Sequence, residues 1–268
     1  MFKTRLLSGI VLVIILIATV GYGGNILFGL LAVISLIGMS ELYKVVEVQD
    51  KVLGFAGYLA AIAYYVLLYL GQTQYVTMLT ILFLVLVMAV YVFSFPTYRA
   101  EQVMTTFFGL FYVAVMLSYV FQTRELPGGG VTVWLIFLSS WGCDTCAYCV
   151  GMLIGKHKMA PKLSPKKSVE GGVGGVLGAA LLGALYALAV NNWGDAGVNV
   201  LHYAVICGVG GMISQVGDLA ASAIKRNHEI KDYGKLIPGH GGILDRFDSV
   251  IFTAPVIYYL ALVLAGTL

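Results

Sequence analysis

Long apolar runs alternate with short polar segments along nearly the whole sequence. A transmembrane helix needs about 20 predominantly apolar residues to cross the roughly 30 Å of hydrocarbon in a bilayer. Runs close to this length occur at residues 6–20, 26–40, 52–70, 75–93, 102–121, 131–153, 171–190, 200–222 and 249–267. The pattern therefore predicts an all-α polytopic membrane protein with about nine transmembrane helices.

Composition supports this fold class. Of the 268 residues, 60% are hydrophobic and 11% are charged, whereas soluble domains have about 45–50% and about 25%. So few charges cannot cover a soluble core, and a net charge of only +3 predicts no nucleic-acid partner. Among the 33 glycines, Gly174, Gly178 and Gly183 share one apolar run and predict close contacts between helices.

The distribution of Lys and Arg predicts the orientation. With the N-terminus in the cytoplasm, all but one of the 16 Lys and Arg residues fall on the cytoplasmic side, and Arg124 is the exception. Cytoplasmic segments of membrane proteins carry an excess of these residues. We therefore expect a cytoplasmic N-terminus and an external C-terminus.

Residues that could take part in catalysis or binding are unevenly distributed along the chain. Residues 1–130 form apolar runs with short polar loops, and no charge there indicates a mechanism. Residues 131–268 contain acids within apolar runs and two cytoplasmic loops, 154–170 and 223–248. We expect the first region to supply N-terminal transmembrane helices and the second to be the catalytic region.

Asp144 and Asp218 lie inside apolar runs, about 9–14 Å below the expected cytoplasmic surface. Charges within a membrane are costly and usually functional. Polar residues lie four positions before and after each acid, namely Ser140, Tyr148, Ser214 and Ser222. This spacing predicts two polar stripes lining one cavity open to the cytosol. The alternative is a pair of structural acids bonded to neighbouring helices.

The first long loop concentrates lysines. Lys166 and Lys167 follow Ser164-Pro165, which we interpret as a stiff turn that holds the two ammonium groups in place. Such a loop could bind a polyphosphate. It could equally anchor the protein to anionic headgroups.

The second loop mixes acids, cations and glycines. Asp245 and Asp248 are three positions apart and, with Asp218 and Asp144, would supply the oxygen ligands that Mg²⁺ prefers. Gly241 and Gly242 allow the backbone to approach a ligand closely. Basic residues suited to binding phosphoryl oxygens are Lys225, Arg226, Lys231, His240 and Arg246. His240 could instead be a structural donor in a tight turn.

The stretch from Ser222 to Asp248, S-A-I-K-R-N-H-E-I-K-D-Y-G-K-L-I-P-G-H-G-G-I-L-D-R-F-D, resembles the signature of the phosphatidate cytidylyltransferase family. D-T-C-A-Y at Asp144–Tyr148 and S-P-K-K-S-V-E-G at Ser164–Gly171 are also similar to family motifs. The resemblance covers about residues 140–250.

This resemblance implies that CTP and phosphatidic acid condense to CDP-diacylglycerol and pyrophosphate. It also implies Mg²⁺ dependence, with a second metal or a monovalent cation as a further option, and a homodimer surrounded by membrane lipids. We expect an integral protein of a bacterial-type inner membrane, with its active site facing the cytoplasm.

The resemblance assigns residues to three groups. Expected metal ligands are Asp218 and Asp245, with Asp144 and Asp248 either as further ligands or as groups that bind the ligands. Expected catalytic residues are Asp218, Asp245, Lys225, Arg226 and Arg246. Expected substrate-binding residues are Lys166, Lys167, Ser164, Ser222, Lys231, His240, Gly241 and Gly242.

Two other classes of function fit part of the pattern. An ion-coupled secondary transporter would explain Asp144 and Asp218, but not the concentration of glycines, lysines and acids in two loops. A CTP-dependent enzyme acting on another lipid phosphate, or a lipid kinase, would keep the chemistry and change the substrate. A purely structural or assembly role is the third alternative.

Overall fold

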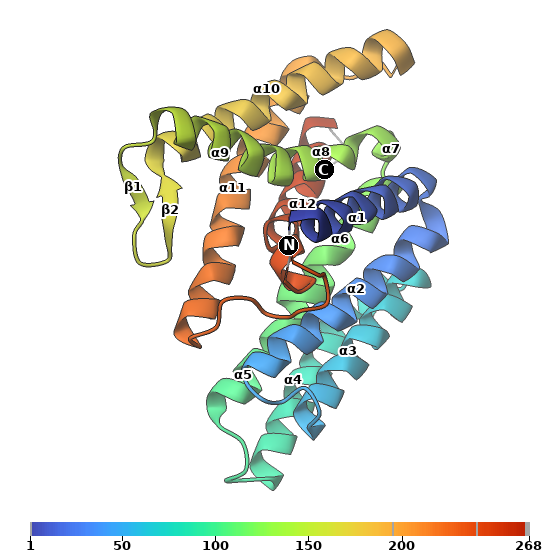
Figure 1. The fold of residues 1–268 in the computed structure, drawn as a ribbon. Helices are drawn as coiled ribbons and strands as arrows, with labels where there is room; N and C mark the ends of the chain where they lie inside the picture. Colours follow the sequence, from blue (N-terminus) through green and yellow to red (C-terminus); the bar gives the residue numbers. More distant parts are fainter. Residues whose placement is uncertain (1, 195, 240, 266–268) are drawn as a thin grey trace. The chain divides into compact units, whose positions relative to one another are not determined.

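The computed structural model describes residues 2–194, 196–239 and 241–265 (Figure 1), so His240 lies outside the described residues. Helices dominate the described part of the chain. The α-helices are α1 Phe2–Tyr22, α2 Gly24–Val45, α3 Val52–Tyr69, α4 Val76–Phe93, α5 Ala100–Gly109, α6 Met116–Glu125, α7 Gly129–Thr132, α8 Trp134–Phe137, α9 Cys143–Ile154, α10 Val169–Gly194, α11 Val200–Asn227 and α12 Leu244–Ala265. A 3₁₀ turn at Thr73–Tyr75 and π-helical turns at Leu110–Val115 and Leu138–Gly142 extend three of these runs.

Eight helical runs in the described residues are long and apolar enough to cross a membrane, and these are Gly24–Val45, Val52–Tyr69, Thr73–Phe93, Ala100–Glu125, Gly129–Ile154, Val169–Gly194, Val200–Asn227 and Leu244–Leu264. The predicted all-α polytopic membrane fold is therefore confirmed. The first predicted run corresponds to a shorter apolar helix, Leu7–Tyr22. At 1.5 Å per residue this segment is about 24 Å long, less than the usual hydrocarbon thickness.

Several helices extend beyond the apolar runs that predicted them. Helix α2 continues to Val45, past Glu41, and α11 continues to Asn227. Helix α12 begins at Leu244, so the segment between α11 and α12 is shorter than the predicted loop 223–248. Hydropathy detects only the part of a helix that suits lipid, because charged residues are tolerated where a helix leaves the hydrocarbon.

The chain divides into two compact units, each built from separate stretches. The N-terminal unit comprises Met1–Ile15, Asn25–Ser118 and Asp232–Asp245, and the C-terminal unit comprises Leu16–Gly24, Tyr119–Lys231 and Arg246–Leu268. In the N-terminal unit, the fully buried Tyr43 donates its hydroxyl hydrogen to the carbonyl of Thr106 at 2.7 Å. Gly57 and Gly109 leave the space that the Tyr43 ring fills.

In the C-terminal unit, α10 packs against both α9 and α11 (Figure 1). Glycines make this close approach possible, as predicted. A Cβ atom added at Gly174 would lie 2.6 Å from Val150, and one added at Gly178 would lie 2.5 Å from Cys146 on α9. At Gly183 the added atom would meet Cys207 of α11 at 2.7 Å.

The first cytoplasmic loop of the prediction forms a β-hairpin. Strands β1 Lys158–Ala160 and β2 Ser164–Ser168 pair antiparallel, with Lys158 opposite Ser168 and Ala160 opposite Ser164. The interpretation of Ser164-Pro165 as a stiff turn is therefore wrong. Proline is tolerated in an edge strand because its missing N–H does not interrupt a ladder.

Candidate functional site

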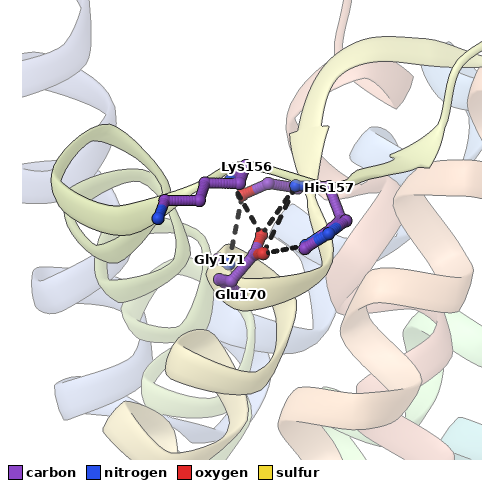
Figure 2. A network of polar contacts seen from close by, with 5 residues as sticks. Lys156, His157, Glu170 and Gly171 are labelled. Atoms are coloured by element: carbon purple, nitrogen blue, oxygen red, sulfur yellow. Dashed lines mark hydrogen bonds and ion pairs between the residues drawn. The ribbon is translucent and has the colours of Figure 1, made fainter.

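The base of the hairpin is fastened to the first turn of α10 (Figure 2). The Glu170 carboxylate accepts the backbone N–H of Lys156 at 3.1 Å and that of His157 at 3.2 Å, and it contacts His157 Nδ1 at 2.5 Å. The hydroxyl of the buried Ser168 accepts the Gly171 N–H at 3.1 Å and so caps the helix. Strand β2 consequently enters the site in a fixed direction.

The two lysines of β2 lie in different surroundings, in a stretch where the pairing with β1 is irregular. Lys166 is exposed to solvent, whereas Lys167 is half-buried and forms an ion pair with Asp218 of α11. The side chains of Lys167 and Asp218 are 25% and 27% exposed, although the Lys167 ammonium nitrogen itself is buried. The structure therefore singles out Lys167.

Three acids and three cations of the C-terminal unit gather around this pair. Asp144 of α9 interacts electrostatically with Asp218, Lys167 and Arg246. Asp248 of α12 interacts electrostatically with Asp218, Lys225 and Asp144. We call these residues the charge cluster, and its members are Asp144, Lys167, Asp218, Lys225, Arg246 and Asp248. All six are among the residues that the sequence predicts for the site.

Close packing between α11 and α12 supports the cluster. A Cβ atom at Gly217 would lie 2.8 Å from the Asp248 carbonyl, so glycine lets the two helices approach beside Asp218. Asp248 is only 8% exposed, and its Oδ1 accepts the Ser249 N–H at 2.8 Å. One oxygen of this carboxylate therefore already accepts a hydrogen bond from its own helix.

Arg246 is held in place through its backbone. The indole N–H of Trp141 donates to the Arg246 carbonyl at 3.4 Å. The side-chain Nε of Arg246 is buried and has no hydrogen-bond partner among the described residues. A buried donor of this kind favours an anionic ligand such as a phosphoryl group.

The predicted stripe around Asp144 is not continuous. Ser140 is buried and donates its hydroxyl hydrogen to the carbonyl of Ile136 at 2.7 Å, while Tyr148 is 66% exposed. The π-helical turn at Leu138–Gly142 contains Ser140 and ends just before Asp144, so it separates Ser140 from the helix face of Asp144. A π turn holds one more residue than an α turn and so rotates the following residues by about 100°.

The acids of the charge cluster suit a metal that arrives with its substrate. In the part of the chain that the structure describes, no three His, Cys, Asp or Glu side chains form a ready metal-binding group. Mg²⁺ usually takes only one or two protein carboxylates and fills its octahedron with substrate phosphates and water. Hard oxygens from one or two of Asp144, Asp218 and Asp248 therefore fit this way of binding Mg²⁺.

Asp245 belongs to the N-terminal unit, where it fastens its own loop. It is 6% exposed, and its Oδ2 accepts the N–H groups of Tyr233 at 2.8 Å and Gly242 at 3.0 Å. Gly241 has a φ of +86°, and a Cβ atom there would lie 2.8 Å from Asp245 Oδ2. A carboxylate has about four lone-pair sites, so the predicted metal role of Asp245 stays a prediction.

The remaining predicted residues show no shared arrangement in the described structure. Arg226 and Lys231 are exposed, whereas Ser164 and Ser222 are half-buried. Gly242 makes room for the side chain of Glu41. Their roles in substrate binding stay predictions.

The sequence profile of the Cytidylyltransferase family matches residues 3–264. The chain belongs to this family. A phosphatidate cytidylyltransferase of Staphylococcus epidermidis is 32% identical over 262 residues, which cover 95% of this chain and 97% of the relative.

Relatives from other bacteria are similar. A phosphatidate cytidylyltransferase of Thermotoga maritima is 32% identical over 270 residues, covering 98% of this chain and 97% of the relative. One of Bacillus subtilis is 30% identical over 181 residues, covering 67% and 66%. The family predicted from the motifs of residues 140–250 is therefore confirmed.

One buried acid was missed by sequence reasoning. Glu41 lies in the region 1–130, where no charge indicated a mechanism, yet it is only 8% exposed. It ends an apolar run and is followed closely by Lys44, which is the ordinary pattern of a helix leaving the membrane. The long spacing to its partners, Ile243 and Leu244, hides the contact from any local pattern.

Proposed function

We propose that this chain transfers the cytidylyl group of CTP to phosphatidic acid, giving CDP-diacylglycerol and pyrophosphate. The charge cluster carries the proposal, because it joins three carboxylates to three cations on α9, β2, α11 and α12. Acids alone would suit a cation-coupled transporter. Acids together with cations suit a polyphosphate and its metal ion. Relatives named phosphatidate cytidylyltransferase also align over nearly the whole chain.

The reaction requires positioning and charge neutralisation. An oxygen of the phosphatidate phosphate attacks the α-phosphorus of CTP, and the bond from that phosphorus to the bridging oxygen of the β-phosphate breaks. Pyrophosphate leaves with that oxygen. The attacking phosphate is already ionised near neutral pH, so no strong general base is needed. Phosphoryl-type transfers depend mainly on in-line alignment and electrostatic stabilisation.

Each part of the charge cluster has a role in this scheme. One or two of Asp144, Asp218 and Asp248 would hold Mg²⁺, which supplies charge neutralisation at the phosphoryl oxygens. Lys167 has three donor hydrogens, so it can keep Asp218 while binding a phosphate oxygen. Arg246 and Lys225 provide further positive charge beside the phosphates.

The location of the enzyme in the membrane and its assembly are also part of the proposal. The chain is an integral membrane protein with eight candidate spans in its described residues. We place the catalytic region at 131–268 and its site on the cytoplasmic side of a bacterial-type inner membrane, because nearly all Lys and Arg residues then face inward. CTP, a soluble anion, and a lipid headgroup can meet there. A homodimer, and a second metal or a monovalent cation beside Mg²⁺, complete the proposal.

Phosphatidate-dependent release of pyrophosphate tests the proposed substrates. Purified protein in detergent micelles is given Mg²⁺ and CTP, with phosphatidic acid, lysophosphatidic acid, dolichyl phosphate or no lipid phosphate. We expect release with phosphatidic acid to exceed that with the other lipids. Equal or faster release with another lipid phosphate would transfer the chemistry to that substrate.

Removal of divalent metal is expected to abolish this release. Without Mg²⁺ the three acids of the charge cluster would repel the triphosphate instead of binding it through a shared cation. Excess EDTA should reduce the rate to background, and added Mg²⁺ should restore it. A rate that persists in EDTA would contradict the assignment of these acids to metal binding.

A further inference from the structure

Glu41 is a buried acid outside the charge cluster. It lies within the apolar helix α2, in the candidate span Gly24–Val45, and is 8% exposed. A carboxylate in such surroundings is costly unless hydrogen bonds or charges compensate for its lost hydration. The groups that bind the Glu41 carboxylate therefore indicate the role of this residue.

Both oxygens of Glu41 bind the start of α12. Oε1 accepts the Ile243 N–H at 3.0 Å, and Oε2 accepts the Leu244 N–H at 2.8 Å. The first N–H groups of a helix have no partner within the helix, and a negative charge there is favourable. Glu41 thus caps α12 from another helix, 203 positions away in sequence.

The surrounding residues make room for this contact. A Cβ atom at Gly234 or Gly242 would collide with the Glu41 carboxylate. One turn earlier on α2, a Cβ atom at Gly38 would lie 3.0 Å from Val113 and 3.7 Å from Leu244. Leu244 is fully buried, and α2 contacts both the backbone and the side chain at the start of α12.

The contact is adjacent to Asp245. Asp245 Oδ2 holds the N–H groups of Tyr233 and Gly242, while Glu41 holds those of Ile243 and Leu244. An isolated bridge between Ile237 and Gly241 closes the same segment. Four backbone groups around Asp245 are therefore fixed by two carboxylates.

We propose that Glu41 is a positioning residue for the reaction. By capping α12 it sets the backbone at Asp245 and the helical phase in which Arg246 and Asp248 follow. The idea rests on the proposed function, because it gives these three residues a part in cytidylyl transfer. Glu41 itself contacts neither substrate nor metal in this scheme.

The test compares two substitutions in α2. Glu41→Gln keeps the size of the side chain but replaces one acceptor oxygen with an amide NH₂ that faces a donor. Tyr43→Phe is the matched control, because it removes a buried hydrogen bond to Thr106, a residue outside segment 232–245. We expect both variants to have a lower Tm in detergent.

Turnover and hydrogen exchange distinguish the two variants. We expect Glu41→Gln to lower kcat about tenfold to 100-fold, since small misplacements near reacting groups are that costly. Amide exchange in residues 232–245 should become faster. Tyr43→Phe should keep kcat close to wild type and leave this exchange unchanged. Glu41→Asp, which retains the charge on a shorter side chain, should show the same changes to a smaller degree and serves if Glu41→Gln does not fold.

Two results would overturn the proposal. One is unchanged exchange in residues 232–245 for Glu41→Gln and Glu41→Asp. The other is a loss of kcat no larger than that of Tyr43→Phe at equal loss of Tm. Inactivity of the wild-type chain toward CTP and phosphatidate would instead contradict the proposed function, and the exchange measurement would still decide whether Glu41 fixes the segment.

Discussion

Replacement of Asp218 by asparagine is expected to lower the rate of cytidylyl transfer by about three orders of magnitude. Asp218 is the partner of Lys167 and interacts with both other acids of the charge cluster. Asparagine has nearly the same shape but no charge, so it removes a metal ligand and an ion pair together. A loss of about 4 kcal/mol of transition-state stabilisation corresponds to this rate change.

Initial rates should be measured beside Tm in detergent, to separate loss of chemistry from loss of folding. Because the Asp218 side chain is 27% exposed, we expect Asp218→Asn to remain folded. Glu125→Gln is a suitable control, since Glu125 is an exposed acid of the same C-terminal unit outside the motifs. A rate for Asp218→Asn within about tenfold of wild type would remove Asp218 from the site, because a lost metal ligand costs more than that.

The two neighbouring lysines of β2 are expected to differ sharply. Lys167→Met should lower the transfer rate about 100-fold, because it removes a half-buried charged donor from the phosphate site. Lys166→Met should leave the rate within about threefold of wild type, as expected for an exposed cation. The same assay and the same lipid mixture serve for both variants.

The comparison also tests the alternative that these lysines only attract anionic headgroups. In that case the two substitutions would have equal effects, and those effects would shrink as salt screens the surface charges. A larger loss for Lys166→Met than for Lys167→Met would contradict the assignment of Lys167 to the phosphate site.

Features that depend on local composition could be predicted from the sequence. The long apolar runs gave the membrane fold, because the bilayer selects helices by length and apolar content. Asp144 and Asp218 were found because an acid inside an apolar run stands out. Motifs shared with a known family then gave the chemistry.

Features that depend on tertiary contacts could not be predicted. Lys166 and Lys167 are both lysines of one short segment, and only the ion pair of Lys167 with Asp218 in the folded chain separates them. The stripe through Ser140 failed because the π-helical turn before Asp144 leaves no mark in the apolar pattern. The role of Glu41 follows only from its hydrogen bonds to the start of α12, which is far away in sequence.

The fate of labelled CTP tests the central claim most directly. Purified protein is incubated with phosphatidic acid, Mg²⁺ and CTP labelled either at the α-phosphate or at the γ-phosphate, and the lipids are extracted. We predict that the α-label enters the organic phase as CDP-diacylglycerol, that the γ-label stays in the aqueous phase, and that EDTA prevents the transfer. A γ-label in the lipid would indicate a kinase, and two aqueous labels with folded protein would contradict the account.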